Sequence, residues 1–142
     1  MKNESNLSHI LGKEHQKIGG MLEQLSSQQL PPSEQKNLFE QFKWAVEKHL
    51  FLEEKAIFTT IDNNTYSHFV PRLLSEHNLL LNLLQKMEQQ LSQSDTINFS
   101  SFSDLLKKHE SFEELTFYPH LEQELNSSQK RLLMEKISIN VR

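Results

Sequence analysis

The most constraining feature of this sequence is a histidine and glutamate pattern that occurs twice. Each half of the chain has a lone histidine and, farther along, a His-x-x-x-Glu unit: His15 with His49 and Glu53, then His77 with His109 and Glu113. Residues four apart lie on one face of an α-helix, so both side chains of a unit can point the same way. This geometry can build a two-metal site inside a helical bundle.

The chain is predicted to be all-α. Only 3 Gly and 4 Pro occur in 142 residues, and the long segments between them carry apolar residues at helical spacing. A single domain over residues 1–142 is expected, because this length closes one hydrophobic core with little room for a second.

The apolar pattern predicts a first helix at about residues 7–26. Pro31 and Pro32 then interrupt the chain, and Ser33 is expected to cap the second helix through its hydroxyl. The turn-forming residues 62–65 separate the second helix from the third.

The third helix is expected to hold Pro71 in its first turns. A polar connection at residues 92–101 leads to the fourth helix, which Pro119 is expected to kink or end. From about Ser127 the pattern predicts a short amphipathic helix packed on the outside.

Each of the four long helices places a histidine on its apolar face, and two of them add a glutamate one turn later. The predicted inward positions are Leu7, Leu11, His15, Ile18, Leu22 and Leu25 in the first helix; Leu38, Phe42, Ala45, Val46, His49, Glu53, Ala56 and Ile57 in the second; Val70, Leu73, Leu74, His77, Leu80, Leu81, Leu84, Met87 and Leu91 in the third; Phe102, Leu105, Leu106, His109, Phe112, Glu113, Thr116 and Phe117 in the fourth; and Leu132, Leu133 and Ile137 in the last. Two uncompensated carboxylates in one core would be costly to bury without cations. We therefore predict a metal site.

Other histidines fit this pattern less well. A single His-x-x-x-Glu can arise by chance, and it is then most simply a solvated pair on a helix surface. His120 with Glu124 is such a third pair, and it is expected at the surface because it has no place in the repeat. His9 and His68 match neither half and are expected to be exposed.

Composition excludes several classes of site and partner. The chain has no cysteine, so a metal must be held by nitrogen and oxygen. The net charge of −4 and the absence of a basic block argue against nucleic acid or an anionic membrane as the partner. No apolar run reaches the roughly 18 residues of a membrane span, and the first residues lack the order of a secretory signal, so a cytoplasmic protein is expected.

Motifs of other metal and hydrolytic enzymes are missing. Ferritin-like di-iron oxidases need Glu-x-x-His, yet none of the seven histidines has a glutamate three positions earlier. Zincin proteases need His-Glu-x-x-His, and His109-Glu110 is followed by Phe112 and Glu113 instead. No serine has the glycine neighbours of a nucleophile elbow. A metal-free structural bundle stays open as the alternative to a metal site.

These motifs resemble those of the hemerythrin-like proteins of the HHE cation-binding family. The order of histidines and glutamates, the doubled glutamates and the run Phe117-Tyr118-Pro119 follow the style of that family over nearly the whole chain. The resemblance implies an up-down-up-down four-helix bundle with a non-haem centre of two iron ions, for which manganese or zinc could substitute. By this resemblance His15 and His49 would serve one iron, His77 and His109 the other, and Glu53 and Glu113 would bridge them.

One departure concerns a fifth histidine. The oxygen-carrying hemerythrins have a second histidine one turn from the ligand in the third helix, and here both such positions, Leu73 and Leu81, are apolar. One iron would then keep an open position or recruit another group. The nearby candidates are Glu14, Glu54, Glu76, Glu110 and Glu114, each expected at the surface or supporting a ligand. With fewer imidazole ligands to support an oxygen complex, the sequence predicts metal binding more strongly than reversible oxygen carriage.

Two functional classes are compatible with such a centre. The first is a module that binds or senses a small diatomic ligand, oxygen or nitric oxide, or iron. The second is a di-iron enzyme that turns over nitric oxide or peroxide, or repairs iron–sulfur clusters. The sequence favours the first class, because no signalling, reductase or cysteine-bearing domain is expected in this chain. It does not indicate which protein partner, if any, the chain binds.

Overall fold

The computed structural model describes residues 7–27, 30–61, 66–93 and 97–141, and this part of the chain is all-helical. Its α-helices are α1 (Leu7–Ser27), α2 (Pro32–Leu52), α3 (Val70–Ser92), α4 (Ser100–Phe112), α5 (Tyr118–Glu124) and α6 (Ser127–Val141). Two π-helical segments, η2 (Glu53–Ile57) and η3 (Glu113–Phe117), continue α2 and α4. The all-α prediction is confirmed. The expected turn at residues 62–65 lies outside the described residues.

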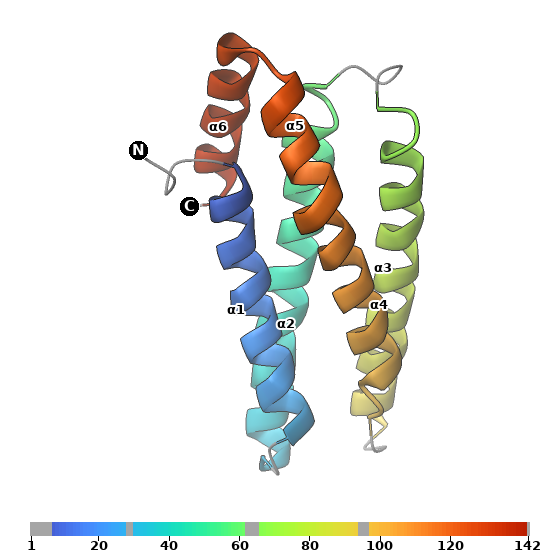
Figure 1. The fold of residues 1–142 in the computed structure, drawn as a ribbon. Helices are drawn as coiled ribbons and strands as arrows, with labels where there is room; N and C mark the ends of the chain where they lie inside the picture. The colour runs from blue at the N-terminus through green and yellow to red at the C-terminus, as the bar shows by residue number, and fades with distance from the viewer. Residues whose placement is uncertain (1–6, 28–29, 62–65, 94–96, 142) are drawn as a thin grey trace.

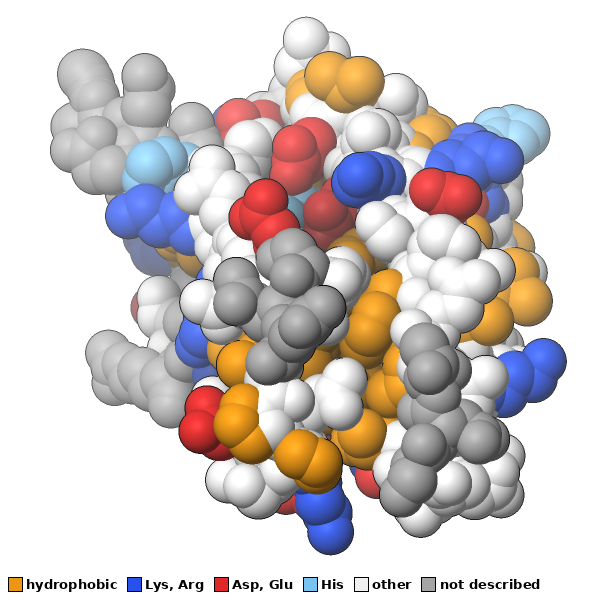
Figure 2. Space-filling model, turned by 90° about the horizontal axis from the view of Figure 1, so that it is seen from below, with side chains coloured by type: hydrophobic (Ala, Val, Ile, Leu, Met, Phe, Trp, Pro, Cys, Tyr) orange, Lys and Arg blue, Asp and Glu red, His pale blue; other side chains and the backbone are white. Residues whose placement is uncertain are grey.

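The long helices lie side by side. Figure 1 shows α1, α2, α3 and the stretch from α4 through α5 along one common axis. The connections from α1 to α2 and from α3 to α4 lie at one end of the molecule, and α6 lies at the other, where it contacts α2 and η2. Seen from the first end, hydrophobic side chains gather toward the centre, and Lys and Arg side chains are spread around the rim (Figure 2). Among the described residues no helix is long and apolar enough to cross a membrane.

Helix α2 begins differently from the prediction. Pro31, not Ser33, occupies the N-cap position, with φ −56° and ψ 150° and no side-chain hydrogen bond to the helix. Pro32 fills the first helical position, where a backbone N–H would have no partner within the helix. The N–H of Gln35 donates to the carbonyl of Pro31 at 2.9 Å. Two adjacent prolines thus start this helix without a capping side chain.

The chain continues as a helix through Pro119, so of the two predicted alternatives, a kink or an end of the helix, the end is wrong. Pro119 lies in the first turn of α5, which follows η3 directly. The N–H of Tyr118 donates to the carbonyl of Glu113, five residues earlier, which is π-helical spacing. This wide turn takes up an extra residue before the proline, and helix formation then resumes despite the missing donor.

The connection between α3 and α4 is shorter than the expected range 92–101. Helix α3 includes Ser92 and α4 already begins at Ser100, while residues 94–96 lie outside the described part. The Asn98 side chain accepts a hydrogen bond from the N–H of Ser100 at 2.9 Å and supports this earlier start. Phe99 is buried, so the connection is not wholly polar.

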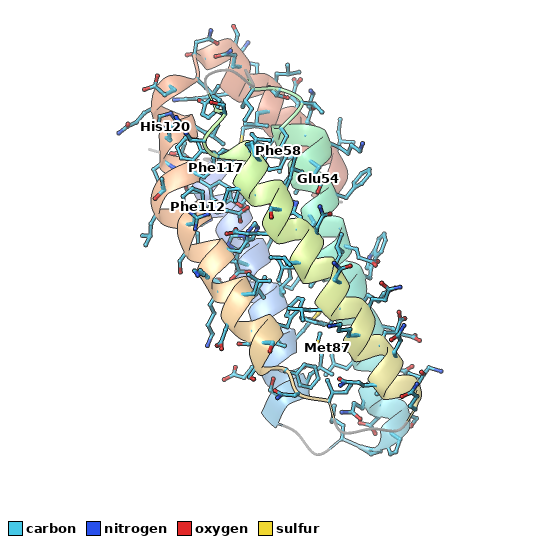
Figure 3. The ribbon with its side chains drawn as sticks, turned by 90° about the vertical axis from the view of Figure 1, so that its right-hand side faces the viewer. Glu54, Phe58, Met87, Phe112, Phe117 and His120 are labelled. Atoms are coloured by element: carbon cyan, nitrogen blue, oxygen red, sulfur yellow. The ribbon has the colours of Figure 1, made fainter. Side chains whose placement is uncertain are left out.

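Two apolar clusters fill the interior, and a polar layer separates them. Buried members of the cluster at the α6 end include Leu11, Leu52, Leu73 and Phe117. Buried members of the second cluster include Ile18, Val46, Leu80 and Leu106. Figure 3 shows Phe58, Phe112, Phe117 and His120 toward one end of the molecule and Met87 toward the other. The histidines lie between these clusters, as His15 does between Leu11 and Ile18, so the fold holds them in an apolar interior.

Most of the predicted inward positions are buried or partly buried, but three are wrong: Leu74 is 37% exposed, Leu132 is 46% exposed, and Thr116 is exposed. Leu74 and Leu132 are each adjacent to a buried leucine, and successive helical residues point about 100° apart, so only one of each pair can face the core. Thr116 points outward because the π-helical turn of η3 moves the inward positions to Phe117 and Tyr118.

Candidate metal centre

Six ionisable side chains converge in the polar layer. They are the six predicted from the repeat: His15 of α1, His49 of α2, Glu53 of η2, His77 of α3, His109 of α4 and Glu113 of η3. All six are buried. Burying a charge costs several kcal/mol unless a partner or a cation compensates it. This cost singles out the cluster as the candidate functional site.

The cluster divides into two groups of four that share both glutamates. The first quartet is His15, His49, Glu53 and Glu113, and the second quartet is Glu53, His77, His109 and Glu113. In each quartet every residue offers one nitrogen or oxygen, and these atoms lie within 4.8 Å of one another. Each quartet therefore has the composition and compactness of a metal-binding position.

Each glutamate places one oxygen in each quartet. Glu53 Oε2 lies 3.5 Å from His49 Nε2 in the first quartet, and Glu53 Oε1 lies 2.8 Å from His77 Nε2 in the second. The corresponding distances for Glu113 are 3.2 Å from Oε1 to His15 Nε2 and 3.1 Å from Oε2 to His109 Nε2. Carboxylates shared in this way can bridge two cations and neutralise part of their charge.

The second nitrogen of every ring contacts a supporting carboxylate. The Nδ1 pairs are His15 with Glu114 at 2.5 Å, His49 with Glu14 at 3.1 Å, His77 with Glu54 at 2.8 Å and His109 with Glu76 at 2.6 Å. Such a carboxylate accepts the Nδ1 hydrogen, which orients the ring and leaves the Nε2 lone pair for a metal. All four glutamates are thus placed to support the histidines, and whether one of them could also coordinate a metal ion stays a prediction.

Glu110, the fifth candidate from the sequence, behaves differently. Its Oε2 atom is buried and has no hydrogen-bond partner among the described residues. Burial, together with the negative charges of Glu113 and Glu114, raises the pKa of Glu110 to about 7, while His15 and His49 act in the opposite direction. Glu110 therefore lies within electrostatic reach of the first quartet without being one of its members.

Both glutamates shared by the two quartets begin a π-helical segment, which the sequence reasoning did not predict. The N–H of Phe58 donates to the carbonyl of Glu53 at 2.9 Å, and the N–H of Tyr118 donates to the carbonyl of Glu113. Single π-helical turns inside α-helices are rare and occur frequently at functional sites. For η3 the available signal was Pro119, because an uninterrupted α-helix accommodates an interior proline poorly.

Sequence reasoning also missed the role of Tyr118, which entered only as part of a family-style run. Its ring is fully buried and stacks on His15, with ring centroids 5.9 Å apart. Its hydroxyl donates to Glu53 Oε2 at 2.6 Å and lies 3.0 Å from Glu113 Oε1. Burial and the charges of these two carboxylates raise the pKa of Tyr118 well above 10, so the hydroxyl is protonated in the metal-free protein.

In the metal-free protein, protonated imidazoles compensate the buried carboxylates. Burial disfavours the charged form of His49, but the charge of Glu53 and hydrogen bonds to Glu14 and Glu53 raise its pKa to about 10. Burial also opposes the charged form of His109, and Glu113 and Glu53 raise its pKa to about 11. For Glu53 burial favours the neutral form, whereas hydrogen bonding with Glu113 and the charge of His49 lower its pKa well below 4.5. Protons thus supply positive charge that cations could supply instead.

Two orphaned atoms indicate that cations fit the second quartet. His109 Nε2 and Glu113 Oε2 are buried and form an ion pair with 3.1 Å between them, yet neither atom makes a hydrogen bond within the described part of the chain. Buried polar atoms of proteins nearly always have a partner. A cation coordinated by this nitrogen and this oxygen would satisfy both atoms, and imidazole with carboxylate suits iron, manganese or zinc.

The remaining histidines belong to neither quartet. His68 is exposed, as predicted, whereas His9 is partly buried, so its expected exposure is only partly right. His120 is also partly buried, with its ring centroid 5.3 Å from that of Tyr66 and 5.1 Å from that of Phe69. Its expected surface position is therefore only partly right. The repeat, more than His-x-x-x-Glu spacing alone, identified the residues that converge.

Comparison with known families agrees with this geometry. A family model described as the hemerythrin HHE cation binding domain matches residues 6–121, a range that contains both quartets and Tyr118. Comparisons with curated proteins and with solved structures give no match. The matched range covers most of the length of this chain, and the chain therefore belongs to the hemerythrin HHE cation-binding family.

Proposed function

We propose that this protein is a non-haem di-iron protein that binds or senses a small ligand. His15 and His49 hold one iron, His77 and His109 hold the other, and Glu53 and Glu113 bridge the two. The observation that carries the proposal is the pair of buried quartets sharing both carboxylates. Imidazole and carboxylate donors suit iron, and manganese or zinc can occupy the same donor set.

The arrangement of the helices supports the finer topology that the family resemblance implied. The long helices lie side by side, with connections at alternate ends of the molecule (Figure 1). We propose that they form the up-down-up-down bundle of the hemerythrins, since this order brings one histidine from each of four neighbouring helices into a single layer.

The proposed ligand is a small diatomic molecule, nitric oxide or oxygen. A bound iron pair supplies a change of redox state and a coordination position for such a ligand. One turn before and after His77 the chain has Leu73, which is buried, and Leu81, which is partly buried, so neither position adds an imidazole to the second quartet. We expect the reduced protein to take up nitric oxide readily and to be oxidised quickly by air, because fewer imidazoles give less support to a stable oxygen complex.

Metal analysis tests the first part of this proposal. Protein purified with iron present is expected to contain about two iron ions per chain. An iron content that stays at zero or one ion per chain after full reconstitution would overturn the di-iron assignment.

Gas binding tests the second part. Anaerobic titration of the ferrous protein with nitric oxide should change its optical spectrum, and stopped-flow mixing with oxygen should give rapid oxidation. Oxygen that is taken up for many minutes and then released intact under vacuum would instead assign the protein to reversible carriage.

A further inference from the structure

The two halves of the centre carry equivalent aromatic residues that differ by one hydroxyl group. Phe58 follows His49 by nine residues, and Tyr118 follows His109 by nine residues. Each residue comes directly after a π-helical segment, Phe58 after η2 and Tyr118 after η3. Both rings are buried. They therefore occupy matching positions in the repeat.

The contacts of these rings match as well. Phe58 stacks on His77, with centroids 5.9 Å apart and planes inclined by 19°. Tyr118 stacks on His15, with centroids 5.9 Å apart and planes inclined by 27°. Each ring thus covers the lone histidine of the opposite half. Phe58 and Tyr118 thus match in sequence position and in stacking. The phenolic oxygen of Tyr118 is therefore the chemical difference between these two equivalent residues.

That oxygen lies among the donor atoms of the first quartet. Tyr118 Oη is 2.6 Å from Glu53 Oε2, 3.0 Å from Glu113 Oε1 and 3.5 Å from His15 Nε2. Ligand atoms about 2.0–2.2 Å from one ion lie roughly 3 Å from one another. The two glutamate oxygens are those that serve the first quartet, so Oη has the spacing of an additional ligand there.

We propose that Tyr118 is a fifth protein ligand, through its phenolate oxygen, to the metal ion held by His15 and His49. This inference rests on the proposed di-iron function. A phenolate is a negatively charged oxygen donor that suits ferric iron, as tyrosine ligation of haem iron illustrates. When the oxygen coordinates, the O–H bond breaks and the proton is released to solvent, because metal binding to a deprotonated ligand displaces its proton. The second quartet has the apolar Phe58 ring instead, and its metal ion keeps more room for an exogenous ligand.

The wild-type spectrum provides the main test. Ferric iron bound by tyrosinate gives a charge-transfer absorption and resonance-enhanced Raman modes of the phenolate ring, which a tyrosine that only donates a hydrogen bond does not give. The chain has only two tyrosines, Tyr66 and Tyr118, so the modes can be assigned by substitution. We expect the ferric protein, loaded with iron and oxidised, to show them.

Two matched variants identify the ligand. Tyr118→Phe should abolish the tyrosinate modes and still bind two iron ions, since each quartet keeps four donor atoms. Phenylalanine is compatible with this environment, as Phe58 demonstrates in the other half. Tyr66→Phe is the control: Tyr66 is buried, belongs to neither quartet, and packs on Phe69 and Phe117. This variant should keep the modes unchanged.

The outcomes separate this inference from the proposed function. Two bound iron ions without tyrosinate modes in the wild-type protein would leave Tyr118 as a hydrogen-bond donor and overturn the inference alone. Modes that disappear in Tyr66→Phe and persist in Tyr118→Phe would also overturn it. A wild-type protein that binds no iron pair would overturn both proposals together.

Discussion

The first half of the molecule, α1 with α2 and η2, and the second half, α3 with α4 and η3, use the same plan with different side chains. Each half supplies a lone histidine, a His-x-x-x-Glu unit, a π-helical segment and a stacked aromatic ring. The supporting carboxylates also correspond, because the glutamate just before each lone histidine contacts the second histidine of its own half, as Glu14 does with His49. The features that repeat therefore place the residues of the two quartets.

Among the differences between the halves, two place a polar group near the first quartet. Tyr118 replaces Phe58, and Glu110 occupies the position that Leu50 has in the first half. The second half thus adds a phenol and a carboxyl group where the first half has only hydrocarbon. This difference indicates that the backbone repeat sets the number of quartets, and that the unmatched side chains make the two quartets chemically distinct.

The largest expected effect comes from removing a shared carboxylate. Glu53→Gln preserves volume but removes the charge, and each quartet includes one oxygen of Glu53. We expect loss of both ions, together with loss of the rise in melting temperature that metal gives the wild type. Elemental analysis and thermal melts measure these effects, with Glu40→Gln on the exposed side of α2 as the control. Retention of one tightly bound ion would mean that Glu53 serves a single position.

The next largest effect is expected in how the melting temperature depends on pH, which should differ between the metal-free and the iron-loaded protein. The folded-state pKa values of about 10 for His49 and about 11 for His109 exceed the unfolded value near 6.5. Their contribution to stability is therefore full below about pH 6.5 and is lost as the pH rises through the folded values. The melting temperature of the metal-free protein should fall between pH 7 and pH 10, and that of the iron-loaded protein should fall less, because its ligands are already deprotonated. Parallel curves would contradict this account.

A smaller effect compares supporting carboxylates of different exposure. Glu76 is 13% exposed and contacts His109, while Glu114 is 44% exposed and contacts His15. Loss of such a partner typically lowers metal affinity tenfold to a hundredfold. We expect Glu76→Gln to reach that range and Glu114→Gln to fall below it, since water can replace an exposed partner. Competition with a chelator measures both affinities, with exposed Glu88→Gln as the control. Equal losses of metal affinity in the two variants would show that the effect of a supporting carboxylate does not depend on its exposure.

The repeat made much of the site predictable from the sequence, and its limits have physical causes. Helical spacing gave the six converging residues, because a regular α-helix fixes which residues share a face. Helical spacing predicted the wrong orientation for Thr116, because the π-helical turn at Glu113 shifts the residues that follow it and a regular α-helical period does not include such a turn. It also left Tyr118 without a role, because the contact between its hydroxyl and Glu53 joins different helices.

The smallest expected effect concerns Glu110, the second unmatched residue. A folded-state pKa of about 7, raised from 4.5 mainly by burial, means that ionised Glu110 destabilises the fold. The sign follows from proton binding: the folded state holds the proton more tightly than the unfolded state, so this cost is absent below about pH 4.5 and complete above about pH 7. Glu110→Gln, which keeps the shape, should therefore raise the free energy of unfolding at pH 8 by on the order of 1 kcal/mol, after allowance for the solvent that still reaches the group. Urea unfolding at pH 8 and pH 5 measures the difference, and the gain should shrink at the lower pH. The same increase in the free energy of unfolding at both pH values would mean that the substitution acts through packing. The charge of Glu110 would then not contribute to the electrostatic difference between the two halves.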